Sequence, residues 1–348
     1  MIKIGNREIT RGGKPFIMAE VGLNHNGEIE KAFEMISVAK RSGVDAVKFQ
    51  TYKAAELVGD PAQMFTYRSQ GKEITESMLE MFKRYEFNEE QWIKVKKKCD
   101  EENILFLSTP QNSSDLDILI KLGVPAIKVG SDDFTNLPLL KNYRKKNIPL
   151  ILSCGMADLA EVHTSLTIAG AFDGHPVILL LCTSEYPTPP ENVNLLKLQT
   201  LSAAFPDLIL GFSDHTQGPL ASSLAIAFGA VVFEKHFTLD HNLPGPDHWF
   251  SENPESLKTW CESIRKAYTM KGSALVAPTR AEKEMRILAR RSITVTADIT
   301  KGDFFSEKNI ALRRPGNGIT PAQWDDVVGK KARQNIKAGT LLKWEEIE

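Results

Sequence analysis

The segment VVFEKHFTLD, residues 231–240, begins as an apolar strand and continues into three ionisable side chains. Its first residues are β-branched or aromatic, which favours a buried strand. Glu234, Lys235 and His236 then follow before the apolar pattern ends. Burying such groups is costly unless they face one another or a ligand. The carboxyl end of a strand that opens on a shared site would satisfy this condition, so we asked whether other strands end in the same way.

The same pattern recurs along the first 272 residues. Short apolar runs alternate with helix-like segments whose apolar residues are spaced by three or four positions. This alternation is typical of a parallel sheet covered by helices, and eight such units are the number that closes a (β/α)8 TIM barrel. The predicted strands are 16–22, 46–52, 105–110, 126–131, 150–156, 177–183, 208–216 and 230–237.

Other features define the expected domains. Residues 1–272 form the predicted barrel domain, which starts with an N-terminal hairpin whose turn is 6–14. The long gap after the second strand predicts an excursion over the barrel top, before a helix that begins near Asn88. After residue 272 the alternation stops, which predicts a linker over 273–285 and a compact, mostly β domain over 286–348. An open doubly wound sheet is the alternative, but AEVGLNHNG is not the GxGxxG turn that it needs.

Composition excludes several classes of function. Of 348 residues, 42% are hydrophobic and 25% charged, and the net charge is −1, which gives no basic field for nucleic acid or an anionic membrane. The chain has no apolar run of membrane-spanning length and no signal-peptide pattern at its N-terminus, so we expect a cytoplasmic protein. The four cysteines lie far apart, which predicts reduced thiols without a disulfide or zinc site.

Polar side chains end every one of the eight predicted strands. Because the carboxyl ends of barrel strands meet at one mouth, we expect these side chains to share one site. They are Glu20; Lys48 and Gln50; Ser108 and Thr109; Lys128 and Ser131; Ser153; Thr183 and Ser184; Ser213, Asp214 and His215; and Glu234, Lys235 and His236.

The residue types at these ends indicate two kinds of chemistry. Lys48 and Lys128 are cations within apolar runs, so each needs either an internal carboxylate or an anionic ligand such as a phosphate. His215 and His236 end adjacent strands, and two neutral imidazoles suit a divalent transition metal, although they could instead be hydrogen-bonded core histidines. Asp247 follows the last strand in a proline-rich loop, where it could meet a polar substrate.

The motifs AEVGLNHNG, KFQTY, STP, KVGS, CTSEYPTP, GFSDHT, EKHFT, PGPDH and RRPGNG, in this order, resemble the sialic acid synthase family over essentially the whole chain. The resemblance implies a TIM barrel followed by a small antifreeze-like (SAF) domain. It implies condensation of phosphoenolpyruvate with an N-acylated mannosamine-type sugar and release of phosphate. It also implies Mn²⁺, or Mg²⁺ or Co²⁺ in its place, and a domain-swapped homodimer in which the small domain covers the partner's barrel.

The resemblance also implies a role for individual residues. His215 and His236 would hold the metal, and Glu20 would handle protons, with Glu234 as the alternative. The residues implied to surround phosphoenolpyruvate are Lys48, Thr109, Lys128, Ser131, Ser153, Ser184 and Ser213. Those implied to contact the sugar are Glu20, Gln50, Asp133, Tyr186, Asp247 and, from the other subunit, Arg314.

Two departures from the family pattern bear on the sugar. Asp132 and Asp133 replace a Gly-Glu pair that is common after the fourth strand, and Ser184 replaces an Asn. Both differences weaken the assignment of N-acetylmannosamine as the sugar substrate, from which the product would be N-acetylneuraminate. A 2,4-diacetamido-2,4,6-trideoxyhexose that gives a legionaminic-type acid stays open, and pseudaminic acid synthase fits less well. A metal-dependent aldolase and a sugar-binding sensor without turnover are the alternatives from other classes.

Overall fold

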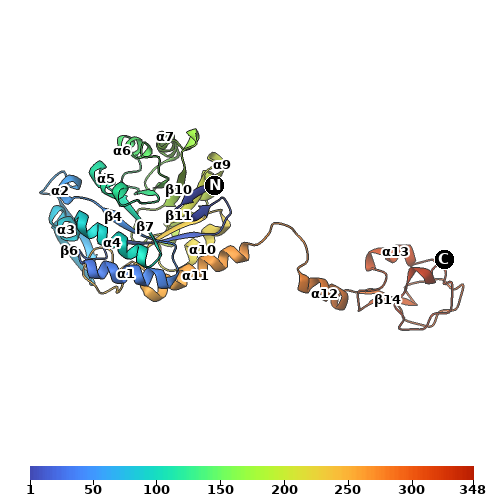
Figure 1. Cartoon of the computed structure of the whole chain (residues 1–348). Coiled ribbons are helices and arrows are strands. Elements are labelled where there is room, and N and C mark those ends of the chain that lie inside the picture. Colours follow the sequence, from blue (N-terminus) through green and yellow to red (C-terminus); the bar gives the residue numbers. More distant parts are fainter. The chain divides into compact units, whose positions relative to one another are not determined.

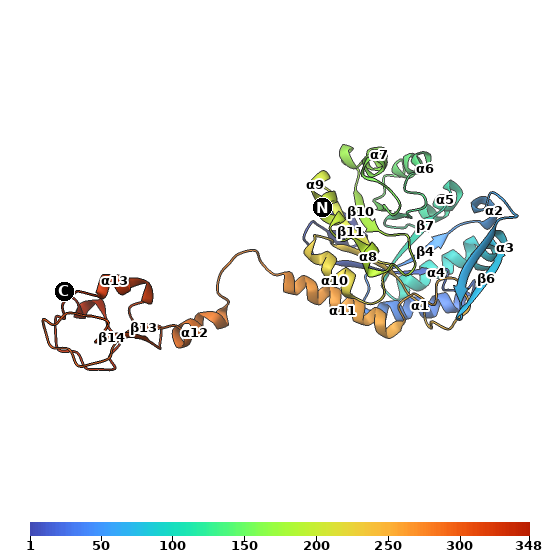
Figure 2. The ribbon, with the colours of Figure 1, turned by 180° about the vertical axis from the view of Figure 1, so that it is seen from behind.

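The computed structural model describes residues 1–348 and divides the chain into two compact units. The first unit is Met1–Gly272 and the second is Ser273–Glu348. Seen from opposite sides, the first unit consists of strands surrounded by helices, whereas the second is smaller and has few regular elements (Figures 1 and 2).

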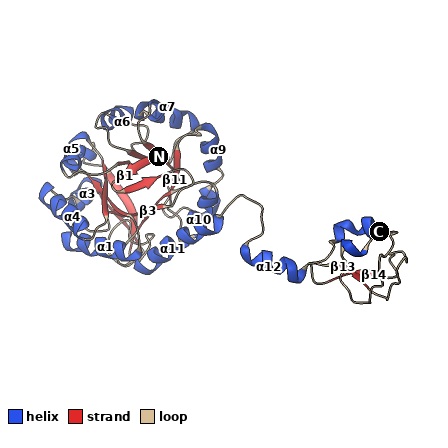
Figure 3. Ribbon diagram, turned by 45° about the vertical axis from the view of Figure 1, so that its right-hand side comes forward, coloured by secondary structure: helices blue, strands red, loops and turns tan.

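Eight parallel strands of the first unit form a nearly closed barrel, which confirms the predicted fold class. Their order is β7-β4-β3-β12-β11-β10-β9-β8, and the two end strands lie side by side. Helices form an outer ring around them (Figure 3). The strands are β3 (Phe16–Gly22), β4 (Ala46–Thr51), β7 (Leu105–Pro110), β8 (Ile127–Val129), β9 (Leu150–Ser153), β10 (Val177–Cys182), β11 (Ile209–Ser213) and β12 (Val232–His236).

Local sequence signals set the ends of several helices. Asn88 caps α4 through its side chain, which accepts a hydrogen bond from the amide of Gln91, and the Gln91 side chain caps the Asn88 amide in return. Gly43 ends α1 with a φ of 88°, a conformation that favours glycine.

No helix is both long enough and apolar enough to span a bilayer. The ring helices are α1 (Ile29–Ser42), α4 (Glu89–Glu101), α5 (Ser113–Lys121), α6 (Leu137–Arg144), α7 (Leu159–Ala169), α9 (Lys197–Ala204), α10 (Leu220–Ala227) and α11 (Pro254–Lys271), with the short α8 (Pro190–Val193) and η1 (Ala171–Asp173) between them.

The barrel interior is apolar near the amino ends of the strands and polar near their carboxyl ends. Successive residues of a strand point to opposite faces. On β3, Phe16 and Met18 belong to the interior cluster and Ile17 and Ala19 to the layer beneath the helices. Glu20, two positions beyond Met18, continues the inward series. The apolar interior consists of Phe16, Met18, Ala46, Leu107, Ala126, Ile151, Ile178, Leu180, Ile209 and Val232, together with residues of the N-terminal hairpin.

The N-terminal hairpin closes the amino end of the barrel. Its strands β1 (Ile2–Ile4) and β2 (Arg7–Ile9) pair antiparallel, and Ile4 and Ile9 are buried in the interior cluster. The predicted turn over 6–14 was wrong, because Arg7–Ile9 is the second strand. Gly5, with a φ of 57°, permits the tighter two-residue connection.

The predicted excursion after the second barrel strand carries elements of its own. It comprises α2 (Ala54–Leu57), the antiparallel hairpin of β5 (Met64–Ser69) and β6 (Lys72–Ser77), and α3 (Met78–Tyr85). Tyr52, Met81 and Tyr85 form a separate buried apolar cluster with Leu23. The excursion is therefore a packed structure, and it contributes side chains to the barrel mouth.

The second unit has its own core, built on two short strands and several isolated bridges. Strands β13 (Ser292–Val295) and β14 (Ile310–Arg313) pair antiparallel, and Ile293, Phe305 and Leu342 are among the buried residues. Helix α12 (Arg280–Ala289) precedes the strands and has no buried residue. The remaining elements are η2 (Pro321–Gln323), α13 (Trp324–Val327) and η3 (Trp344–Glu346).

We expect Ile9→Ala to lower the free energy of unfolding by about 2–5 kcal/mol, because it removes a fully buried side chain and leaves a cavity in the barrel floor. Urea unfolding followed by circular dichroism measures this change. Ile93→Ala is the matched control, because Ile93 lies on α4 with 52% of its surface exposed. Equal effects of the two substitutions would contradict a role of the hairpin in closing the barrel.

Candidate active site

A cavity of about 580 Å³ lies at the carboxyl ends of the barrel strands. Its wall contains most residues that the sequence assigned to the site, so the structure brings them together as the strand-end argument predicted. The predicted residues on this wall are Glu20, Lys48, Gln50, Thr109, Lys128, Ser131, Ser153, Ser184, Tyr186, Ser213, His215, Glu234 and His236.

Three predicted sugar contacts are not on the wall of this cavity, namely Asp133, Arg314 and Asp247. Asp133 accepts a hydrogen bond from the side chain of Asn136 at 2.9 Å, at the start of α6, and Asp132 lines the cavity in its place. In this structure the turn that begins α6 engages the Asp133 side chain, and its contact with the sugar stays a prediction. Arg314 has an exposed side chain and belongs to the second unit.

A second cavity of about 450 Å³ adjoins the first and shares Gln50, Ser184, Tyr186 and His236 with it. Asp247 lines this second cavity. Its wall is rich in aromatic side chains that the sequence analysis did not single out. They come from the excursion and from the loop after β12, and they are Phe65, Tyr67, Phe82, Trp249 and Phe250. The alternation in MFTYRS, residues 64–69, is the signal that could have indicated a strand with one apolar face.

Four buried charged side chains form a balanced cluster at the bottom of the first cavity. Lys48 Nζ lies 2.7 Å from Glu20 Oε2 and 3.8 Å from Glu234 Oε2. Lys128 Nζ lies 3.6 Å from Glu234 Oε1. Each ammonium thus faces a carboxylate, which is the internal pairing that the sequence left open. A cluster of two cations and two anions avoids the large cost of an unpaired buried charge.

Hydroxyl and amide groups complete the hydrogen bonding of this cluster. Lys48 donates to Thr109 Oγ1 at 3.1 Å and Lys128 donates to Ser153 Oγ at 2.8 Å. Ser213 Oγ donates to Glu234 Oε1 at 3.0 Å, and Gln50 Nε2 donates to Glu20 Oε1 at 3.2 Å. The ammonium groups and these hydroxyls lie on one wall, and such donors suit a phosphate or carboxylate ligand.

The two carboxylates of the cluster differ in their affinity for a proton. Burial raises the pKa of Glu20, against the opposing charge of Lys48. Burial also acts to raise the pKa of Glu234, but the charges of Lys128 and Lys48 outweigh it, so this pKa is lowered. Glu20 is therefore the carboxylate that takes up a proton more readily, and Glu234 stays ionised beside Lys128.

His215 and His236 face the same cavity, with 5.6 Å between their ring centroids. The carbonyl of Thr183 lies 2.7 Å from His215 Nδ1 and can only accept, so Nδ1 carries a hydrogen and Nε2 is the nitrogen that a metal could take in place of a proton. Burial acts to lower the pKa of His215, but its contact with Cys182 outweighs burial, so this pKa is raised. Burial, together with the charge of His215, lowers the pKa of His236 well below its ordinary value, which keeps that imidazole neutral.

These two imidazoles fit a divalent metal with an incomplete set of protein ligands. His236 Nδ1 is buried and has no hydrogen-bond partner, so a nitrogen of this ring is free to bind a ligand. No cluster of three His, Cys, Asp or Glu side chains is placed to hold a metal without other ligands. The pair would therefore supply two ligands and leave the other positions to water and substrate, as in a catalytic rather than a structural site.

Asp247 is the acidic group nearest to His236, with 3.8 Å between Asp247 Oδ2 and His236 Nδ1. Burial, with a further contribution from the charge of Glu20, raises the pKa of Asp247 to about 7. Near neutral pH this carboxyl group can therefore both donate and accept a hydrogen bond at the boundary between the two cavities.

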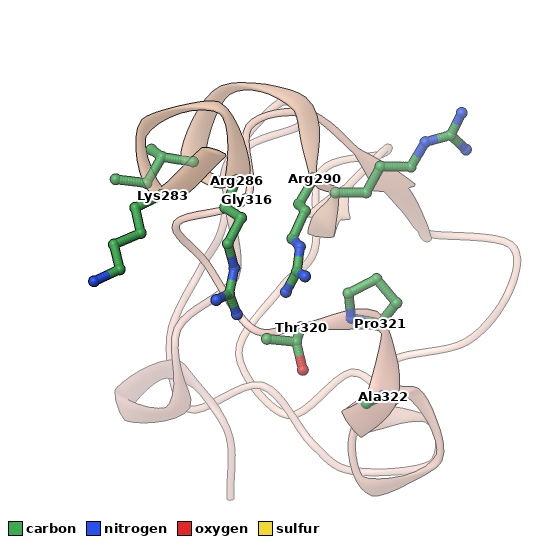
Figure 4. Close-up of a pocket in the computed structure, with 9 residues that line it drawn as sticks. Lys283, Arg286, Arg290, Gly316, Thr320, Pro321 and Ala322 are labelled. Carbon is green, nitrogen blue, oxygen red and sulfur yellow. The ribbon is translucent and has the colours of Figure 1, made fainter. Parts of the chain in front are cut away.

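The second unit contains a separate hollow of about 590 Å³ between α12 and the loop around residue 320. Lys283, Arg286 and Arg290 line it, and the last two extend toward Thr320 (Figure 4). It includes none of the predicted site residues.

Comparison with known proteins identifies the family of this chain. The NeuB family model matches residues 35–275, and the SAF domain model matches residues 290–348. The N,N'-diacetyllegionaminic acid synthase of Legionella pneumophila is 42% identical over 96% of this chain and 94% of its own length. The pseudaminic acid synthase of Campylobacter jejuni is 31% identical over 98% of each chain.

A solved structure has a similar fold. The crystal structure of the N-acetylneuraminic acid synthetase of Leptospira borgpetersenii matches with a TM-score of 0.74 and 32% identity, over 82% of this chain and 94% of that one. The barrel mouth gathers the predicted strand-end residues, and the relatives are named as sialic-type acid synthases. The chain therefore belongs to the NeuB family of nonulosonic acid synthases and carries a C-terminal SAF domain.

Proposed function

We propose that this enzyme condenses phosphoenolpyruvate with 2,4-diacetamido-2,4,6-trideoxymannose and releases phosphate, which gives a legionaminic-type acid. The observation that carries the proposal is the arrangement of one buried charge cluster and two imidazoles in a single cavity. The cluster suits an enol phosphate and the imidazoles suit a metal, and a sugar aldehyde between them would meet both.

Phosphoenolpyruvate binds, in this proposal, against Lys48 and Lys128. The ligand brings negative charge to a cluster in which the charges of two lysines and two glutamates cancel. Its binding therefore favours uptake of a proton by the cluster. Glu20 is the acceptor, because its pKa is the one that is raised. A neutral Glu20 releases Lys48 from its ion pair, and Ser131, Ser153 and Ser213 supply further donors to the phosphate or carboxylate.

The metal is Mn²⁺ or another divalent ion, held by His215 and His236. When bound, such an ion supplies Lewis acidity to a sugar oxygen. Side chains of the protein position the sugar. Gln50 and Tyr186 line both cavities and Asp247 lines the second, and in this proposal they hold the sugar with its aldehyde carbon near C3 of phosphoenolpyruvate. Fixing two reacting carbons in this way can contribute about 7–11 kcal/mol to lowering the barrier.

Glu20 moves the protons of the reaction. C3 of phosphoenolpyruvate forms the new bond to C1 of the open-chain sugar, and neutral Glu20 gives its proton to the aldehyde oxygen, which becomes a hydroxyl group. This leaves cationic character at C2, where water adds and returns a proton to the Glu20 carboxylate. The tetrahedral intermediate then breaks the C2–O bond to the phosphate, and the C2 hydroxyl gives its proton to the departing phosphate, which leaves the keto acid.

The aromatic wall of the second cavity supports the choice of sugar. Phe65, Phe82 and Phe250 present apolar surface next to Tyr186 and Asp247. Such surface suits the C6 methyl group and the acetamido methyl groups of a trideoxy sugar better than the hydroxyl groups of N-acetylmannosamine. The relative that is 42% identical carries the name of the corresponding synthase.

Helix α12 supports a homodimer in which the second unit of one subunit covers the barrel of its partner. The helix has ten residues and buries none, although isolated helices of this length are marginal in water. Met285, Ile287 and Leu288 on it are 55%, 53% and 65% exposed. A second copy of the chain would bury this apolar surface, and Arg314 of the covering unit would then meet the sugar.

Incubation with phosphoenolpyruvate, Mn²⁺ and a panel of sugars tests the reaction. We expect phosphate release and a product of matching mass with the 2,4-diacetamido sugar, and weaker turnover with N-acetylmannosamine. Mass spectrometry identifies the product. Faster turnover of N-acetylmannosamine would replace the proposed sugar, and product without phosphate release would indicate an aldolase instead.

Exchange of the two cavity carboxylates for amides separates their roles. We expect Glu20→Gln to lower kcat about 10²- to 10⁴-fold with both substrates saturating, because it removes the proton donor. Glu234→Gln should instead raise the KM for phosphoenolpyruvate, because burial lowers the pKa of Lys128 and the charge of Glu234 is what favours its cationic form. Steady-state kinetics measure both effects. Full turnover by Glu20→Gln would remove Glu20 from this role.

Coexpression of two variants, assayed at a sugar concentration at which each alone has little activity, tests the dimer. We expect Arg314→Ala to raise the KM for the sugar and His236→Ala to abolish turnover. If each second unit covers the partner's barrel, mixed dimers contain one intact site, so a random mixture regains about a quarter of normal activity. If coexpressed subunits recover no activity, each second unit serves its own barrel. If Arg314→Ala leaves the KM for the sugar unchanged, the second unit has no role in the site.

A further inference from the structure

A buried ion pair lies directly behind the two histidines, on the outer side of the barrel wall. Lys235 Nζ is 3.0 Å from Asp214 Oδ2, and the two side chains are 3% and 0% exposed. Asp214 precedes His215, and Lys235 precedes His236. Because successive strand residues alternate, the histidines point into the barrel and this pair points toward the helices. Neither residue lines either cavity at the barrel mouth, so neither touches a substrate placed there.

The ion pair ties together the backbone on both sides of His215. Lys235 also donates to the carbonyl of Thr216, so one ammonium group contacts the residue before His215 and the residue after it. Asp214 Oδ1 accepts from the amide of Thr216 at 2.9 Å and from its hydroxyl at 2.7 Å. The segment that carries His215 is therefore fixed by a side chain that is covalently adjacent to His236.

Further bonds anchor this pair to the surrounding helices and to the segment after His236. Ser222 on α10 donates to Asp214 Oδ2 at 2.5 Å, and Trp260 on α11 donates to Ser222 Oγ at 2.9 Å. Glu252 lies 3.7 Å from Lys235 Nζ, and its amide donates to the carbonyl of His236 at 2.9 Å. The network thus reaches the backbone of both histidines from the side opposite to the cavity.

Stability alone is a weak reason for such a network. A buried ion pair is often no more stabilising than apolar side chains of the same volume, whereas it fixes one geometry. The other positions of this layer beneath the helices are mostly apolar, for example Phe212 and Phe233 on the same two strands. The charged pair occurs directly after the end of β11 and at Lys235 of β12, where the next residue in each case is a candidate metal ligand.

We infer that Lys235 and Asp214 are positioning residues that hold the imidazoles of His215 and His236 at the spacing at which both bind one metal ion. This inference rests on the metal-assisted function proposed above. Groups behind metal ligands commonly fix their orientation, and their loss typically weakens metal affinity about 10- to 100-fold. Here the support acts through the backbone of the two ligands rather than through the rings.

Titration calorimetry of the metal-free enzyme with Mn²⁺ tests the inference without any measurement of activity. We expect Lys235→Met to weaken Mn²⁺ binding about 10- to 100-fold. Phosphoenolpyruvate binding in the absence of metal should stay within about twofold, because Lys48 and Lys128 are not part of the network. Ser222→Ala is the milder variant, and loss of its hydrogen bond should weaken Mn²⁺ binding about two- to tenfold.

Asp45→Asn is the matched control for a general loss of stability. Asp45, whose side chain is 8% exposed, forms an ion pair with the partly exposed Arg7 at the amino end of the barrel. The Asp45→Asn substitution should lower the midpoint of thermal unfolding and leave the affinity for Mn²⁺ unchanged. Unaltered Mn²⁺ affinity in folded Lys235→Met and Ser222→Ala would overturn the inference alone. Absence of Mn²⁺ binding by the unmutated enzyme would overturn the metal part of the proposed function, and the inference with it.

Discussion

The balance of charge inside the barrel is the constraint on which the site depends. Lys48 and Lys128 extend into an interior that is otherwise closed by apolar side chains, and each has a carboxylate within 4 Å. Their cost of burial is met only because Glu20 and Glu234 arrive from strands that neighbour one another in the sheet. The same four groups then define where an anion can enter and which carboxyl group can change its protonation.

The alternation of side chains along a strand gives the barrel wall two functions at one place. Inward residues at the ends of β11 and β12 form the candidate site, and outward residues one position away form the network beneath α10 and α11. Lys235 and Asp214 belong to the second group. A short stretch such as EKH thus contributes to the cavity and to its support at the same time, which explains why the apolar run of the strand is interrupted by consecutive ionisable residues.

Much of the fold was predictable because its signals are local. The apolar runs that mark the eight strands depend only on neighbouring residues, and the structure has a barrel strand within each predicted range. Asn88 was expected near the start of a helix and is the cap of α4. The N-terminal hairpin was less well predicted, because the strands on either side of the Gly5-Asn6 turn have only three residues each, which is too short to show periodicity. The gathering of the strand-end residues followed from the barrel topology alone.

The sequence by itself determined the barrel, the second domain and the types of residue that meet at the barrel mouth, since periodicity and strand order are written in adjacent positions. Only the tertiary structure decided which carboxylate faces which lysine, why Glu20 rather than Glu234 holds a proton more readily, and that Asp132 rather than Asp133 faces the cavity. It also brought Phe65 and Phe250 to one wall. These outcomes depend on side-chain direction in loops and on contacts between distant segments, and neither leaves a local pattern in the chain.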